Sequence, residues 1–182
     1  LCAIESRNGV SGNGTVAVES VAQSPDGTLW IGTDSGLFAL DPTTGATLRF
    51  DRANGLPDTW VPDLLVARDG RLWVGTGGGA CVLAAWDGKE ARFTALAGKV
   101  HIPPAPAEIL VEDADGKIWV GPRLRVDPAT WTATAFGPED GCSFRTFFIA
   151  SRARTADGHL LFGSPEGLLV VQPGSLHPWT FA

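Results

Sequence analysis

Few residues in this sequence are of types that could do acid–base or metal chemistry. The three histidines are His101, His159 and His177, and no two of them lie at a spacing that favours a shared metal ion. His159 directly follows an Asp-Gly pair, where we expect a solvated turn residue. His101 lies in a proline-stiffened segment, residues 97–107, and Glu108 follows that segment. His101 is therefore a candidate for contact with a ligand, and the alternative is a plain surface loop.

Other reactive signatures are weak. The stretch GTGGGA, residues 75–80, is rich in glycine but joins two predicted strands, whereas a phosphate cradle needs the N-terminus of a helix. We therefore predict a β-turn there. The pair Glu112-Asp113 precedes another turn, where it could hold a cation or cap the turn. The sequence gives no reason to expect a metal ion or a cofactor.

Composition excludes several classes of partner. The chain has 182 residues with a formal net charge of −6 and no basic cluster, so neither nucleic acid nor an anionic membrane surface is an expected partner. No apolar run approaches the roughly 18 residues of a membrane span, and we expect no direct insertion of this segment. The cysteines Cys2, Cys81 and Cys142 form no metal-like spacing, and their odd number leaves one disulfide or three thiols open.

A repeat organises the whole chain. An Asp-Gly pair followed by an apolar strand and a glycine occurs at residues 26–32, 69–75, 115–121 and 157–163. Each unit holds enough turn signals for four short strands, and a strand that is apolar on both faces must be covered on both faces. This pattern predicts an all-β fold, a β-propeller of four-stranded antiparallel blades with about four repeats in this chain. The predicted repeats are residues 11–53, 54–97, 98–137 and 138–182, and residues 1–10 are the last strand of a preceding blade.

The repeated tryptophans are predicted to be structural. Trp30, Trp73 and Trp119 occupy the same position of their copies, where a large ring would fill the space between neighbouring blades. Leu161 replaces tryptophan in the fourth copy. The third copy lacks the Thr-x-x-Gly-Leu element, so its second turn must be short.

The pattern V-x-x-[LI]-x-x-[DS]-x-x-G-x-L-W-[IV]-G-T-x-x-G-L resembles the two-component regulator propeller repeat, most closely over residues 18–37 and 61–80. The stretch from Gly141 to Pro173 is similar to the family's closing blade. The resemblance implies a periplasmic sensor propeller of a bacterial membrane-bound regulator, whose output is a histidine kinase or a diguanylate cyclase. Because such propellers usually have about seven blades, this chain is expected to be part of a larger ring, and the alternative is that its four blades close a small ring.

Three functions are compatible with these observations. The first is a non-catalytic sensor that binds a small molecule, for example a saccharide, or that acts through a partner protein or a homodimer. The second is a streptogramin-lyase-like enzyme, which would use His101 and Glu108. The third is a protein-interaction scaffold. A ligand would bind on the face that carries the inter-blade connections and the second turn of each blade.

Candidate ligand-binding residues lie on that face. They are Asp34, Trp60, His101 and Arg145, with Thr76 and Phe144 as neighbours to consider. Trp60 lies outside the repeated Leu-Trp pair, so its ring could stack on a sugar or cap the blade below.

Overall fold

Strands make up almost all of the regular structure in the computed structural model, which describes residues 16–100, 102 and 105–175. The strands pair into four antiparallel sheets, and within each sheet their order follows the chain. The first sheet contains β1 (Val18–Gln23), β2 (Leu29–Thr33), β3 (Gly36–Leu40) and β4 (Thr47–Phe50). The second contains β5 (Asp63–Val66), β6 (Leu72–Thr76), β7 (Gly79–Trp86) and β8 (Ala91–Ala95).

The second half of the chain forms the other two sheets. The third contains β9 (Leu110–Glu112), β10 (Ile118–Val120), β11 (Leu124–Asp127) and β12 (Thr132–Ala135). The fourth contains β13 (Arg152–Arg154), β14 (Leu160–Ser164) and β15 (Gly167–Val171). Short 3₁₀ turns lie in the connections, at η2 (Arg52–Asn54), η3 (Leu96–Gly98), η4 (Pro138–Asp140) and η5 (Pro173–Ser175).

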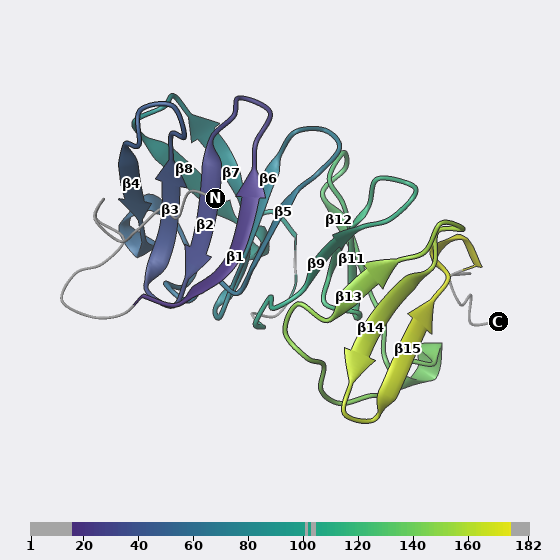
Figure 1. Ribbon diagram of the computed structural model, residues 1–182. Coiled ribbons are helices and arrows are strands. Elements are labelled where there is room, and N and C mark those ends of the chain that lie inside the picture. The colour runs from purple at the N-terminus through teal and green to yellow at the C-terminus, as the bar shows by residue number, and fades with distance from the viewer. Residues whose placement is uncertain (1–15, 101, 103–104, 176–182) are drawn as a thin grey trace.

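The sheets follow one another as the blades of a propeller (Figure 1). The first strand of each sheet is the inner one, since β1 lies beside β5 and β5 beside β9. The predicted all-β fold of antiparallel blades is therefore confirmed. The fourth blade has three strands among the described residues, and the strand predicted for residues 1–10 lies outside them. In the described part of the chain, no helix has the length and apolar character needed to cross a membrane.

A threonine in the second turn holds each of the first two blades to the next one. The main-chain oxygen of Thr33 accepts a hydrogen bond from Val61 N at 2.8 Å, and that of Thr76 accepts one from Ala107 N at 2.9 Å. The threonine hydroxyls close their own turns, because they donate to the carbonyls of Gly36 (2.7 Å) and Gly79 (2.6 Å). The Thr-x-x-Gly element is thus both a turn and a junction.

The glycine before each of these threonines permits the close approach. A Cβ atom on Gly32 would lie 2.5 Å from the carbonyl oxygen of Val61, and one on Gly75 would lie 2.1 Å from that of Ala107. These contacts involve backbone atoms of the following blade, which cannot move aside without shifting its inner strand. Any side chain at these two positions would therefore push the blades apart.

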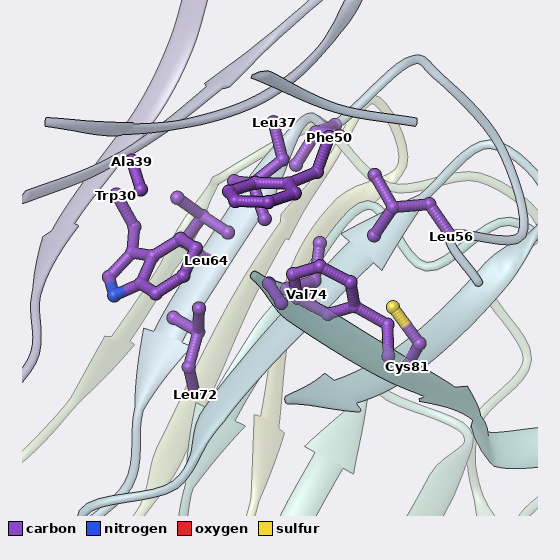
Figure 2. Packing of buried hydrophobic residues seen from close by; sticks show 12 residues of the cluster. Trp30, Leu37, Ala39, Phe50, Leu56, Leu64, Leu72, Val74 and Cys81 are labelled. Atoms are coloured by element: carbon purple, nitrogen blue, oxygen red, sulfur yellow. The ribbon is translucent and has the colours of Figure 1, made fainter. Parts of the chain in front are cut away.

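The repeated tryptophans fill the space between blades, as predicted. Trp30, Trp73 and Trp119 are 0%, 0% and 1% exposed. Figure 2 shows Trp30 among Leu64, Leu72 and Val74 of the second blade. Trp73 packs in the same way against the third blade, and Trp119 against Leu160 and Phe162 of the fourth. Burial of such large rings is a dominant contribution to core stability.

The three indole N–H groups are not equally satisfied. Trp30 Nε1 donates to Ser24 Oγ at 2.9 Å, and Trp119 Nε1 donates to Asp113 Oδ2 at 3.0 Å. Ala67 occupies the corresponding position of the second blade, and the buried Trp73 Nε1 has no partner among the described residues. A buried donor without a partner costs free energy, so the second blade carries a defect that its neighbours lack.

Ala67→Ser is expected to stabilise the protein by about 1 kcal/mol, because the new hydroxyl can accept from Trp73 Nε1 as Ser24 does from Trp30. Urea unfolding of the wild type and the variant measures the difference. Ser24→Ala should cause a loss of similar size, and Ala84→Ser, at an exposed site, should change little. A neutral or destabilising Ala67→Ser would contradict the assignment.

Candidate functional site

The turns and connections at the strand ends form two faces of the propeller, and these faces differ in how closely their residues follow the repeat. The Asp-Gly turns lie on one face, and the connections between blades lie on the other, together with the second turn of each blade. On the second face, residues 96–109, the β10–β11 turn and residues 136–151 depart from the repeat. A site specific to this chain is therefore expected on that face.

An apolar pocket of about 430 Å³ lies there between the second and third blades. It is bordered by the β6–β7 and β10–β11 turns, η3, part of the following connection and the end of β12. The residues that matter most for its chemistry are Leu96, Ile102, Pro106, Arg123, Ala135 and Phe136. Its volume falls within the usual range of small-molecule sites, and Arg123 is the one ionisable side chain among the described residues that line it.

The short second hairpin of the third blade creates this pocket. Only three residue pairs join β10 to β11, whereas five join β2 to β3. Pro122 stands where the first two blades have threonine, and Gly121 adopts a φ of 60°. The predicted shortening is therefore confirmed, because the β10–β11 hairpin of the third blade is shorter than the β2–β3 hairpin of the first blade. The stretch GTGGGA of the second blade forms the predicted β-turn.

Trp60 lies at the junction between the first and second blades. Its carbonyl oxygen accepts a hydrogen bond from Gly77 N at 3.1 Å, and a Cβ atom on Gly77 would be 3.0 Å from its Cε3. The half-buried indole thus covers the β6–β7 turn, as in the capping interpretation. Asp58 orients the segment: it pairs with Arg52 at 2.9 Å, and the hydrogen bond from Trp60 N lowers the pKa of its carboxyl group.

The other predicted site residues are dispersed. Asp34 is exposed in the β2–β3 turn, and Arg145 is exposed before the fourth blade, where its N donates to Glu166 Oε1 at 2.7 Å. His101 lies outside the described residues. Within the described part, no hydrogen bond or ion pair joins Asp34, Trp60 and Arg145 to one another. Their roles in ligand binding stay predictions.

A buried ion pair links three blades. Asp63 of β5 accepts from Arg152 Nη2 of β13 at 2.8 Å and from Leu110 N of β9 at 2.6 Å. Burial raises the pKa of Asp63 above its usual value, and the Arg152 cation and the backbone N–H groups offset part of that rise. Sequence reasoning missed this contact, although Arg152 was visible as a cation where the other copies are mostly apolar.

The pair Glu112-Asp113 serves the turn that follows it. Buried Asp113 accepts from Asp115 N at 2.9 Å and from Lys117 N at 3.0 Å, and it also binds Arg125 Nε at 2.7 Å. The capping interpretation is therefore confirmed. No group of three His, Cys, Asp or Glu side chains in the described ranges could hold a metal ion.

The cysteines that the structure describes are thiols. Cys81 and Cys142 are both buried and free, and burial raises the pKa of the Cys81 thiol well above its usual value. A buried neutral thiol of this kind is a weak nucleophile. Cys2 lies outside the described residues.

Residues 11–35 and 55–78 match the two-component regulator propeller family model. The two matched segments overlap the two copies in which the sequence resemblance is greatest. No curated protein matches the chain significantly.

Solved structures share the fold. The extracellular domain of the hybrid two-component system BT3049 from B. thetaiotaomicron matches 86% of this chain with 20% identity and a TM-score of 0.74. That of the one-component system BT4673 from the same organism matches 88% with 26% identity and a TM-score of 0.70. The match covers 22% and 21% of those two chains, so this chain spans about a fifth of their length.

A catalytically inactive virginiamycin B lyase from Staphylococcus aureus, solved with quinupristin, is more distant. It matches 88% of this chain and 57% of its own, with 14% identity and a TM-score of 0.55. At this level of identity the likeness concerns the propeller fold alone.

Replacing Arg152 by Met is expected to destabilise the protein by about 2–4 kcal/mol at neutral pH, because Asp63 would keep a buried charge without its cation. The loss should shrink as the pH falls. Without Arg152 the folded-state pKa of Asp63 rises further above the unfolded value, so stability declines as the pH rises through it. Chemical unfolding between pH 4.5 and 8 measures this dependence.

Arg154→Met is the matched control, because Arg154 lies on the same strand but is exposed and has one long hydrogen bond, 3.4 Å, to Glu112 O. An equal loss in both variants, or a loss in Arg152→Met that does not depend on pH, would count against the ion pair.

Proposed function

We propose that this chain is a non-catalytic, ligand-binding segment of the sensor propeller of a bacterial signal-transduction receptor. The observation that carries the proposal is the match of residues 11–35 and 55–78 to the two-component regulator propeller model. Extracellular domains of a hybrid two-component system and of a one-component system share the fold. The pocket between the second and third blades supports a binding role, since it is concave and largely apolar.

The remaining parts of the proposal concern the whole receptor. We place the propeller in the periplasm and assign the output to a histidine kinase or a diguanylate cyclase. A small molecule or a partner protein, including a second copy of the receptor, would supply the signal. The inter-blade face would receive it, because the segments that depart from the repeat lie there.

The first test concerns topology. In the full-length protein, alkaline phosphatase fused after Val171 should be active and β-galactosidase at the same position inactive, because only the former works outside the cytoplasm. The coding sequence should continue into a transmembrane helix and then a kinase or cyclase domain. Active β-galactosidase fusions, or a continuation without either feature, would contradict the receptor assignment.

The enzymatic alternative can be tested separately. We expect the full-length protein to leave quinupristin intact in a mass-spectrometric assay, because Glu108 is partly buried just before β9 and no His, Cys, Asp or Glu side chains in the described ranges form a group that could hold a metal ion. Turnover that is lost in a His101→Ala variant would support a lyase and reject the non-catalytic role. Turnover that survives this substitution would point to a contaminant or another site, which a second purification step separates.

A further inference from the structure

The first and second blade junctions can be compared through a hydrogen bond that both of them make. Val61 N donates to the carbonyl of Thr33, and Ala107 N makes the same bond to Thr76. The residue before each donor is therefore equivalent. It is Trp60 at the first junction and Pro106 at the second.

The second junction has no indole at the position that Trp60 occupies in the first junction. The indole of Trp60 covers Gly77 in the β6–β7 turn. At the second junction the indole is replaced by a proline ring, and the β10–β11 turn that it would cover is shortened. The 430 Å³ pocket is bordered by Pro106 and by residues 120–124 of that turn. It therefore occupies the site that a protein indole fills one blade earlier.

The walls favour an apolar group. Leu96 is 1% exposed, and most of the other described residues that line the pocket are alanine, glycine, proline, valine or leucine. A saccharide would lose hydrogen bonds to water in such a pocket and would find few donors or acceptors to replace them. An aromatic ring would bury apolar area without that cost.

One charge accompanies these walls. The exposed Arg123 borders the pocket, and its Nη2 donates to the carbonyl of Phe144. Arg123 forms no ion pair within the described residues, so part of its guanidinium group is available to a ligand. A planar guanidinium with free N–H groups matches a carboxylate better than any neutral group.

We propose that this pocket binds a small aromatic carboxylate. The ring lies on the β10–β11 turn, in the position that Trp60 occupies at the first junction, and the carboxylate pairs with Arg123. This inference deepens the proposed function, because it names the class of ligand that the sensor would bind. The pocket geometry nevertheless carries it independently of any signalling role.

Titration calorimetry on the full-length protein tests the ligand class with indole-3-acetate and its neutral analogue indole-3-acetamide. We expect a dissociation constant on the order of 0.1–1 mM for the acid, and about three- to tenfold weaker binding of the amide. Arg123→Gln should remove the difference between the two compounds. Arg92→Gln, at an exposed arginine of β8 outside the pocket, should preserve it.

Pro106→Trp tests the location, because it returns to the second junction the residue found at the first. It should weaken binding of indole-3-acetate more than tenfold and raise the melting temperature. Ala135→Phe fills the pocket from the exposed end of β12 and should also block binding, which guards against a folding defect in the first variant. Ala85→Phe, at an exposed strand position away from the pocket, is the matched control.

Three results would overturn the inference. The first is no binding of either indole compound by the wild type at about 10 mM, a concentration well above the expected dissociation constant. The second is binding that survives both Pro106→Trp and Ala135→Phe. The third concerns maltose, which should not bind when titrated in parallel; maltose binding that Pro106→Trp abolishes would assign the pocket to saccharides instead. Binding as predicted in a protein whose fusions report a cytoplasmic location would reject the receptor and leave the pocket assignment intact.

Discussion

The close approach of consecutive blades at a glycine is the constraint on which the rest of this structure depends. At Gly75 the backbone of the third blade comes so near that a single Cβ atom would collide with Ala107 O. The threonine that follows uses this proximity to accept a hydrogen bond from the next inner strand. Because the inner strands are fixed in this way, the sheets diverge outward, and the space between them must be filled by a large ring. The Trp-x-Gly-Thr order of the repeat thus follows from one contact.

A rigid junction also explains why small departures from the repeat become specific features. If the blades could slide, a shorter hairpin would be compensated by tighter packing. Here the second and third blades are held by the Thr76–Ala107 bond, so the three missing residues of the third blade leave a pocket. Ala67 likewise leaves a local defect, an indole N–H of Trp73 without an acceptor. The ring cannot turn toward another acceptor because the core around it is fully packed.

The sequence predicted what depends on local pattern. It predicted the blades, the buried tryptophans, the glycine-rich turn and the short third hairpin, because each is encoded within one copy of the repeat. It did not predict the contact between Asp63 and Arg152, which lie 89 residues apart and meet only because three inner strands converge. Trp60 could be placed on the correct segment, but its contact with Gly77 depends on the path of the connection. The pocket escaped prediction for the same reason, since its walls come from two blades and a non-repeating segment.

The hydrogen bonds and ion pairs that join the second and third blades determine how a ligand in the pocket could act on the junction. The inner strands are joined by Asp63 and Leu110, at 2.6 Å. On the Asp-Gly face, Arg68 pairs with Glu112 at 3.1 Å, and Arg71 donates to the carbonyl of Pro128 at 2.9 Å. The pocket lies on the opposite face, where the outer parts of the two blades leave a gap. A ligand there would touch both blades beside the Thr76–Ala107 hydrogen bond, so its binding free energy would act on the angle between their outer parts. Coupling of this kind requires two arrangements that the ligand distinguishes, and a junction whose inner strands are held while its outer parts leave a pocket is where a propeller can provide them.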